Sequence, residues 1–278
     1  MFKRIVKPTS VFRRLGAASE NIKTLVETPK LGRLVLARHG ETEFNIKEIW
    51  AGLYNTELTP NGERQAVNLG IILRENRLVP DIVITTPLNR ARDTTKLALT
   101  TMEIGAEVIE MPALLELHPG ALIGTKKTPE NKRFIKEWYT RPPAMDLEHP
   151  YHPQNNKGTI AMPPNGLGSE SLEDVAIRTR GAFEEIMRMI KNGEDILIVG
   201  HSNHLSAFIS HMTGIKEKNS IKNAEPKEVF FDVVNGEMVF SRMDVLSLST
   251  KLFPSAEIIS PKAELLDSSK EKGGAEID

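Results

Sequence analysis

The chain of 278 residues contains no cysteine. Disulfide bonds, thiolate metal sites and a cysteine nucleophile are therefore excluded, and the composition suits a reducing compartment. No apolar run approaches the ~20 residues that a membrane-spanning helix needs, so we expect no membrane partner. The formal net charge is only -1, which gives no global attraction to nucleic acid or to an anionic surface. Any anion-binding site must therefore come from a local group of basic residues.

Acidic residues are missing from the first 19 residues, which carry five basic ones. Arg-rich, acid-poor N-termini are typical of organelle transit peptides, but a solvated basic extension has the same composition. We favour a basic extension over residues 1–30 and a cytoplasmic location, with organelle targeting by residues 1–19 as the open alternative. At the other end we expect a tail over residues 246–278, which from Ser260 on is rich in Lys, Glu, Ser and Gly.

Apolar runs alternate with helical patterns over residues 31–245, which we expect to form one domain. The predicted strands are 33–37, 81–85, 107–109, 195–199, 229–234 and 238–242, and the last two form a hairpin around Asn235-Gly236. The predicted helices begin after Thr59 and span 88–102, 169–191 and 203–211. Residues 125–168 are rich in proline and are predicted to be a lid-like insertion. This alternation predicts an α/β sheet with helices on both faces.

Two histidines follow buried-looking strands, and ligands of such sheets bind beyond the carboxyl ends of the strands. His39 lies in an Arg-His-Gly turn. An imidazole can attack phosphorus when one ring nitrogen is free and a backbone carbonyl holds the other. Arg38 offers a planar fork of donors to phosphate oxygens, and Thr42 and Asn45 could add neutral donors. Taken alone this turn is a weak signal, because a histidine at a strand end is more often structural.

Four motifs in one order strengthen the signal. They are RHGETEFN followed by Gly52 and LTPNGERQA, then TTPLNRARDT (85–94), LLELHPGALIG (114–124), and ESLEDV followed by ILIVGHSNHL (196–205). Together they resemble the histidine phosphatase superfamily, also called the phosphoglycerate mutase-like superfamily, over residues 32–243. The resemblance implies a three-layer sandwich with a mostly parallel central sheet, and it makes residues 31–245 the catalytic domain.

The resemblance also implies the site and its chemistry. His39 would attack phosphorus, Arg38, Arg90 and His201 would bind the phosphoryl oxygens, and Glu116 would serve as general acid and base. The substrate-binding candidates are Thr42, Asn45, Gly52, Lys127 and Asn203. For Asn45 and Asn203 a role in a turn or helix cap is an equally good interpretation. No metal is expected, because cationic side chains supply the charge that a metal would bring. The implied partner is a small phosphorylated substrate, and a homo-oligomer is left open.

Mutase and phosphatase activities use the same machinery. The segment PPAMDLEHPY (142–151) and Lys127 resemble phosphoglycerate mutases, which use 2,3-bisphosphoglycerate as a phosphoryl primer. Three departures point the other way: Ile135-Lys136 replaces a tandem arginine pair, Ile49–Leu53 replaces a run containing arginine and a hydroxyl, and Ser206 replaces an arginine. Each neutral replacement removes a charge-assisted bond worth about 1.5–3 kcal/mol. We therefore predict hydrolysis of a small phosphomonoester without a cofactor. The alternative is a 2,3-bisphosphoglycerate-dependent mutase of glycolysis, and the third hypothesis is a catalytically inactive binding protein.

Overall fold

A computed structural model describes residues 30–133, 170–215 and 221–248. The predicted N-terminal extension up to residue 29, the tail from residue 249 and most of the predicted insertion lie outside the described residues. The chain divides into two compact units, Met1–Ser247 and Leu248–Asp278, and the elements below all belong to the first. Among the described helices, none has the length and apolar composition required to cross a bilayer.

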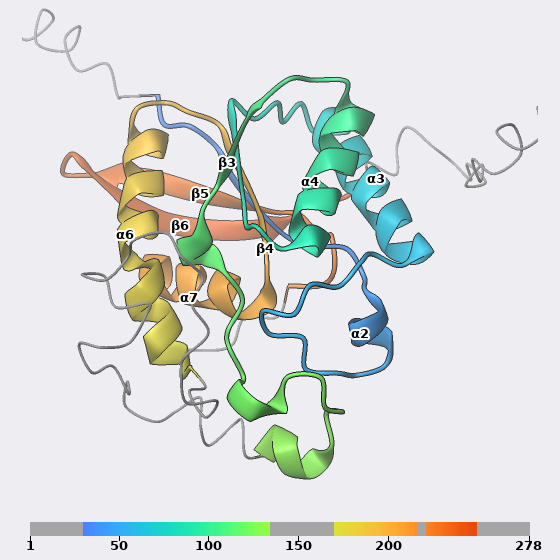
Figure 1. Cartoon of the computed structure of the whole chain (residues 1–278). Coiled ribbons are helices and arrows are strands. Elements are labelled where there is room, and N and C mark those ends of the chain that lie inside the picture. The colour runs from blue at the N-terminus through green and yellow to red at the C-terminus, as the bar shows by residue number, and fades with distance from the viewer. Residues whose placement is uncertain (1–29, 134–169, 216–220, 249–278) are drawn as a thin grey trace, which may run out of the picture. The chain divides into compact units, whose positions relative to one another are not determined.

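A six-stranded sheet forms the centre of the described residues. Its strands are β1 (Leu34–Arg38), β2 (Ile82–Thr85), β3 (Glu107–Glu110), β4 (Ile196–Gly200), β5 (Lys227–Val234) and β6 (Glu237–Val245). Their spatial order is β3-β2-β4-β1-β5-β6 (Figure 1). The first four strands of this order are parallel, whereas β5 runs antiparallel to β1 and β6 antiparallel to β5. The predicted mostly parallel sheet is confirmed.

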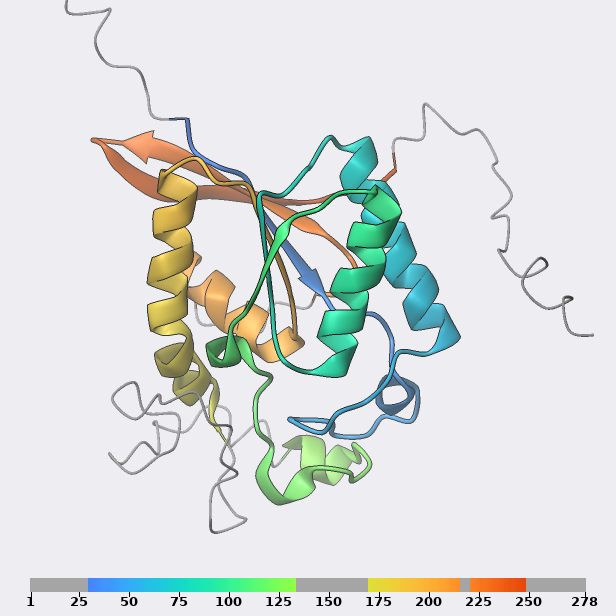
Figure 2. The ribbon, with the colours of Figure 1, turned by 45° about the horizontal axis from the view of Figure 1, so that its top comes forward.

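Helices cover both faces of this sheet, as the predicted fold requires. Helices α3 (Pro60–Glu75) and α4 (Asn89–Met102) lie on one side, and α6 (Leu172–Lys191) and α7 (Ser202–Thr213) lie on the other (Figure 2). Alternate residues of a strand point to opposite faces, and β1 shows this clearly. Val35 packs in the cluster under α3 and α4, while Leu34 and Leu36 pack in the cluster under α6 and α7. Two separate apolar cores therefore hold the sheet between its helices.

Local sequence signals account for the element ends. The Thr59 hydroxyl accepts a hydrogen bond from the Gly62 amide at 2.9 Å and caps α3. Ser171 and Asp174 form a reciprocal capping box, so α6 begins at Leu172 rather than at the predicted residue 169. Asn235 and Gly236 both have positive φ, as a tight hairpin between β5 and β6 requires. The short helix α2 (Glu43–Ile46) and the 3₁₀ turns η1 (Pro112–Leu114) and η2 (Gly120–Leu122) were not predicted.

Candidate active site

The two strand-terminal histidines lie side by side. Strands β1 and β4 are parallel neighbours, and their register pairs Arg38 with Gly200. The chain therefore leaves both strands at the same level, and the His39 amide donates to the Gly200 carbonyl at 2.8 Å. The rings of His39 and His201 are 5.2 Å apart between centroids, and both side chains are almost fully buried. The structure thus brings together the two histidines that the sequence singled out.

The ring of His39 is held by its own turn. Its Nδ1 lies 2.7 Å from the Gly40 carbonyl oxygen, which can only accept, so Nδ1 carries the hydrogen and donates it. The lone pair of the neutral ring is then on Nε2. Burial lowers the pKa of His39 well below its ordinary value, and the positive charges of Arg90 and Arg38 lower it further. The ring is therefore kept neutral with one defined nitrogen available for attack.

Two residues that the sequence analysis missed fix the backbone of this turn. The Gly40 amide donates to the Thr94 hydroxyl at 2.9 Å, and the Asn223 side-chain amide donates to the His39 carbonyl at 2.8 Å. Thr94 closes the second motif, so its position in that motif was a usable signal. Asn223 lies 184 residues from His39 along the chain and carries no local pattern that could have identified it.

The ring of His201 is held through its other nitrogen. Its Nε2 lies 2.8 Å from the hydroxyl of Thr86, a buried residue directly after β2 that was also missed. Its Nδ1 is buried and has no hydrogen-bond partner among the described residues. Burial lowers the pKa of His201 well below its ordinary value, with Arg90 and His39 adding to the shift. His201 is therefore neutral, with Nε2 held by the Thr86 hydroxyl and Nδ1 buried at the start of α7.

Arg90 is among the most deeply buried large side chains of the protein. Two of its nitrogens donate to the carbonyls of Tyr54 and Gly52, each at 2.9 Å, and its buried Nε has no acceptor in the part of the chain that the structure describes. Burial lowers the pKa of Arg90 to about 10, while Glu116 opposes the shift. The guanidinium remains charged at neutral pH. Gly52, predicted to bind substrate, is placed as an anchor of Arg90 through its carbonyl.

Glu116 lies at the N-terminus of α7. Its Oε1 accepts hydrogen bonds from the Leu117 amide at 2.8 Å and from the Asn203 amide at 3.2 Å. Its negative charge also opposes the lowering of the pKa of Arg38 and of Arg90, which places it in the same cluster. Asn203 therefore donates its backbone amide to Glu116, and its buried side-chain oxygen has no hydrogen-bond partner within the described residues.

Unpartnered polar atoms gather around these residues. They are Arg38 Nε, Arg90 Nε, His201 Nδ1 and Asn203 Oδ1, all buried and without a hydrogen bond among the described residues. Each such atom costs about 1–3 kcal/mol when it stays unpaired, so a group of them indicates a ligand site. Two of them belong to cationic donors, which suit the oxygens of a phosphoryl group. The arrangement can hold such a group beside the free nitrogen of His39.

The remaining predicted residues have local partners. Thr42 and Asn45 cap α2 reciprocally, with the Thr42 amide 3.1 Å from Asn45 Oδ1 and the Asn45 amide 3.3 Å from the Thr42 hydroxyl. Lys127 lies with its amino group 5.2 Å from the centre of the Trp50 ring. His204, expected to be a packing residue, accepts from the His201 amide at 3.2 Å through Nδ1. The structure thus gives Thr42 and Asn45 a capping role beside the site.

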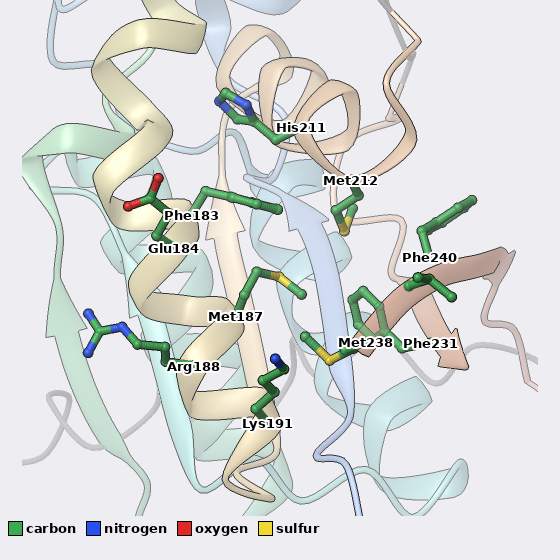
Figure 3. Close-up of a pocket in the computed structure, with 11 residues that line it drawn as sticks. Phe183, Glu184, Met187, Arg188, Lys191, His211, Met212, Phe231, Met238 and Phe240 are labelled. Carbon is green, nitrogen blue, oxygen red and sulfur yellow. The ribbon is translucent and has the colours of Figure 1, made fainter. Parts of the chain in front are cut away.

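An apolar hollow lies elsewhere, between α6 and the β5–β6 hairpin. Its volume is about 590 Å³, and Figure 3 shows phenylalanine and methionine side chains around it. None of the residues gathered around His39 lines it. Among the described residues there is also no group of three or more side chains that could hold a metal ion. The polar cluster at the ends of β1 and β4 is therefore the candidate active site.

Known proteins resemble this chain in sequence and in fold. The family model described as histidine phosphatase superfamily (branch 1) matches residues 34–227. Phosphoglycerate mutase 1 of Saccharomyces cerevisiae is 28% identical over 201 residues, which are 68% of this chain and 81% of that protein. The 2,3-bisphosphoglycerate-dependent phosphoglycerate mutase of Corynebacterium glutamicum is 33% identical over 195 residues, covering 67% and 79%.

Solved structures with this fold include phosphatases. A mycobacterial glucosyl-3-phosphoglycerate phosphatase is 21% identical with a TM-score of 0.58, and the match covers 78% of this chain and all of that one. The α-ribazole phosphatase of Shigella flexneri is 24% identical with a TM-score of 0.54, covering 77% and 95%. At these identities the likeness concerns the fold alone.

Proposed function

Because the chain belongs to the histidine phosphatase superfamily, we propose that it hydrolyses a small phosphomonoester through a phosphohistidine formed on His39. Membership makes the chain an enzyme that acts on small phosphorylated substrates. The observation that carries the proposal is the ring of His39: Nδ1 is held by the Gly40 carbonyl, so the lone pair is on Nε2. A low pKa keeps that lone pair unprotonated at neutral pH.

The first step forms the phosphoenzyme. Nε2 of His39 attacks phosphorus, and the bond from phosphorus to the ester oxygen breaks. Arg38, Arg90 and His201 stabilise the charge on the three equatorial oxygens through their unpartnered nitrogens. Glu116, in its protonated form, gives its proton to the leaving oxygen, so the product is a neutral alcohol.

The second step regenerates the enzyme. Glu116, now a carboxylate, accepts a proton from water as the water oxygen attacks the phosphorus of the phosphohistidine. The phosphorus–nitrogen bond breaks, its electron pair returns to Nε2 of His39, and inorganic phosphate leaves. The hydrogen bond from Nδ1 to the Gly40 carbonyl persists through both steps and stabilises the positively charged ring of the intermediate.

Hydrolysis is preferred over mutase activity because of position 206. A mutase must retain a doubly phosphorylated intermediate, which needs further basic residues around the site. Ser206 is buried in the second turn of α7, and its hydroxyl donates to the Ser202 carbonyl at 2.8 Å. It therefore brings no positive charge where the mutases carry an arginine. Water is then the acceptor that this site serves best.

The alternative is a 2,3-bisphosphoglycerate-dependent phosphoglycerate mutase, with the bisphosphate as primer. Two observations favour it. The relative from Corynebacterium glutamicum, 33% identical, bears that name. Lys127 is retained next to the Trp50 ring, on the loop that follows the Glu116 motif. In this case a monophosphoglycerate hydroxyl, rather than water, would attack the phosphohistidine.

One assay separates the two functions. Purified protein is incubated with a panel of phosphomonoesters, including 3-phosphoglycerate with and without 2,3-bisphosphoglycerate, and free phosphate and 2-phosphoglycerate are both measured. We expect free phosphate from several esters, loss of that activity in His39→Ala, and retention in His211→Ala, a matched histidine on α7 outside the site. Conversion of 3- to 2-phosphoglycerate with little free phosphate would establish the mutase instead. Unchanged phosphate release by His39→Ala would overturn both.

A further inference from the structure

A buried ion pair joins α6 to the segment that precedes it. Arg178 Nε lies 2.8 Å from Glu170 Oε1, and a second guanidinium nitrogen lies 3.0 Å from Oε2, so the contact is bidentate. The side chains are only 4% and 2% exposed. Burial of two charges brings little net stability, because desolvation offsets most of their attraction. Fold stability alone is therefore a weak reason for this pair.

The same two side chains hold the backbone on both sides of Glu116. The third guanidinium nitrogen of Arg178 donates to the Ala113 carbonyl at 2.7 Å and to the Leu115 carbonyl at 3.1 Å. Oε2 of Glu170 accepts from the His118 amide at 2.9 Å. Figure 1 shows the segment after β3 passing beside α6, where these contacts form. Glu116 thus lies between a fixed carbonyl before it and a fixed amide after it.

The backbone of the segment that carries Glu116 is not part of a regular element. Residues 115–118 belong to no helix or strand, so their buried polar groups depend on side chains for partners. A general acid must be held to within about 0.5 Å of its productive position, and residues on irregular segments need such support most. The hydrogen bonds from the Leu117 and Asn203 amides fix only the carboxylate group of Glu116. The ion pair holds its backbone.

We propose that Arg178 and Glu170 are positioning residues that align Glu116 for proton transfer. The inference rests on the proposed function, in which Glu116 protonates the leaving oxygen. Formation of phosphohistidine on His39 needs that proton only when the leaving group is a strong base. An alkyl phosphate releases a strongly basic alkoxide, whereas p-nitrophenyl phosphate releases a weakly basic phenolate. A displaced Glu116 therefore slows the first step for the alkyl ester selectively.

The test compares these two esters in single-turnover experiments on the full chain. In the pair variant Glu170→Gln/Arg178→Met no buried charge is left unpaired, so we expect the fold to persist. We expect phosphorylation of His39 by the alkyl ester to fall about 10²-fold, the size associated with a misplaced catalytic group. Phosphorylation by p-nitrophenyl phosphate should stay within about threefold, which also shows that the variant is folded. Arg178→Lys keeps the positive charge but loses the bidentate contact with Glu170. Its phosphorylation rate with the alkyl ester should fall by a smaller factor, again without a matching loss for p-nitrophenyl phosphate.

Two controls define the outcomes. Glu116→Gln gives the selectivity expected when the acid is absent, and Arg180→Gln, an exposed arginine on the same helix, should leave both rates unchanged. Equal losses for the two esters in the pair variant and in Arg178→Lys would mean a purely structural role and overturn the inference, as would no loss at all. If His39→Ala still released phosphate, the proposed function would fail, and the ion pair would not be the cause.

Discussion

The ends of β1 and β4 have the same arrangement of a buried strand followed by a histidine. They differ in which nitrogen of the histidine ring is held by a hydrogen bond. Each strand is buried, each is followed at once by a histidine, and the two lie next to each other in parallel. His39 is held through Nδ1 by the Gly40 carbonyl, whereas His201 is held through Nε2 by the Thr86 hydroxyl. The same side chain is therefore anchored through Nδ1 at one strand end and through Nε2 at the other. A nucleophile and a hydrogen-bonding group can arise from one residue type in this way.

The backbone after each histidine explains the difference. After His39 the chain enters a turn, and the Gly40 carbonyl is free to face the ring. After His201 the chain enters α7 directly, with His201 as the cap residue. The carbonyl of Ser202 then points along the helix, where it accepts from the Ser206 hydroxyl. The His201 ring instead contacts a residue at the end of another strand, because the Thr86 hydroxyl after β2 lies beside its Nε2.

Replacement of each histidine by asparagine should separate the roles of the two rings with the largest effect. His39→Asn removes the nucleophile, so the phosphoenzyme should disappear and turnover should fall by about 10⁴-fold or more. His201→Asn removes one group that stabilises charge, and a loss of about 10²–10³-fold is expected with a phosphoenzyme still formed. Rapid quenching followed by mass spectrometry locates the phosphate. A label on residue 201 in either variant would reverse the roles assigned to the two rings.

Gly200→Ala tests the packing of the β4 end against the His204 ring. A Cβ at Gly200 would overlap the His204 ring, which accepts from the His201 amide. Relief of such an overlap usually costs about 1–3 kcal/mol, and we expect the free energy of unfolding to fall by that amount in urea titrations. In a His204→Ala background the same change should cost less than half as much. An equal cost in both backgrounds would show that the ring is not the obstacle.

The sequence predicted the two strand ends well because the signals are local. Apolar runs ending in His39 and His201 place both residues beyond the carboxyl edge of a sheet, and the motif around Arg90 adds the buried cation. Thr86 belongs to the second motif, but its partner lies 115 residues away in sequence, and the partner of Asn223 lies 184 residues away. Contacts across such separations depend on strand order, which periodicity does not specify. The sequence alone therefore indicated the candidate reactive groups but missed the residues that orient them.

There is a second reason why the sequence predicted the site only in part, and it concerns Thr42, Asn45 and Gly52. They were predicted to bind substrate, on the strength of their place in the first motif. In the structure Thr42 and Asn45 cap α2, and the Gly52 carbonyl accepts from Arg90. A short polar residue or a glycine can serve the backbone as readily as a ligand, and a motif records only that the residue is present. Their direct contact with substrate stays a prediction.

Thr86→Val removes only the hydrogen bond that anchors the His201 ring, so a smaller effect is expected. Valine keeps the shape of threonine and removes the hydroxyl that fixes His201 Nε2. A neutral hydrogen bond is worth about 0.5–1.5 kcal/mol, so kcat/KM should fall about three- to tenfold. Thr86→Ser, which restores the hydroxyl, should recover most of the loss. Steady-state kinetics on the preferred ester measures both variants, and an unchanged kcat/KM in Thr86→Val would mean that His201 needs no anchor.

The smallest expected effect concerns Arg38 and the protonation of the two rings. Burial is the main cause of the low pKa of both histidines, and Arg90 is the next. Arg38 comes third for His39 but last of the five causes for His201. A lowered pKa means that the neutral ring persists as the pH falls below 6.5, so protonation reduces nucleophilicity only at more acidic pH. The two rings should therefore respond unequally to the loss of this arginine.

Histidine ring signals followed by NMR from pH 8 to pH 5.5 measure this response, with His39→Asn and His201→Asn used for assignment. In the parent protein the pKa of each ring should lie below that of a solvent-exposed histidine, which titrates near pH 6.5. In Arg38→Gln one positive charge is removed, so the pKa of His39 should rise, and it should rise more than that of His201. Lys47→Gln, which changes an exposed lysine near α2, should move neither. An equal rise at both rings would mean that Arg38 acts on the site as a whole, and that the nucleophile is distinguished from its neighbour by the anchored nitrogen alone.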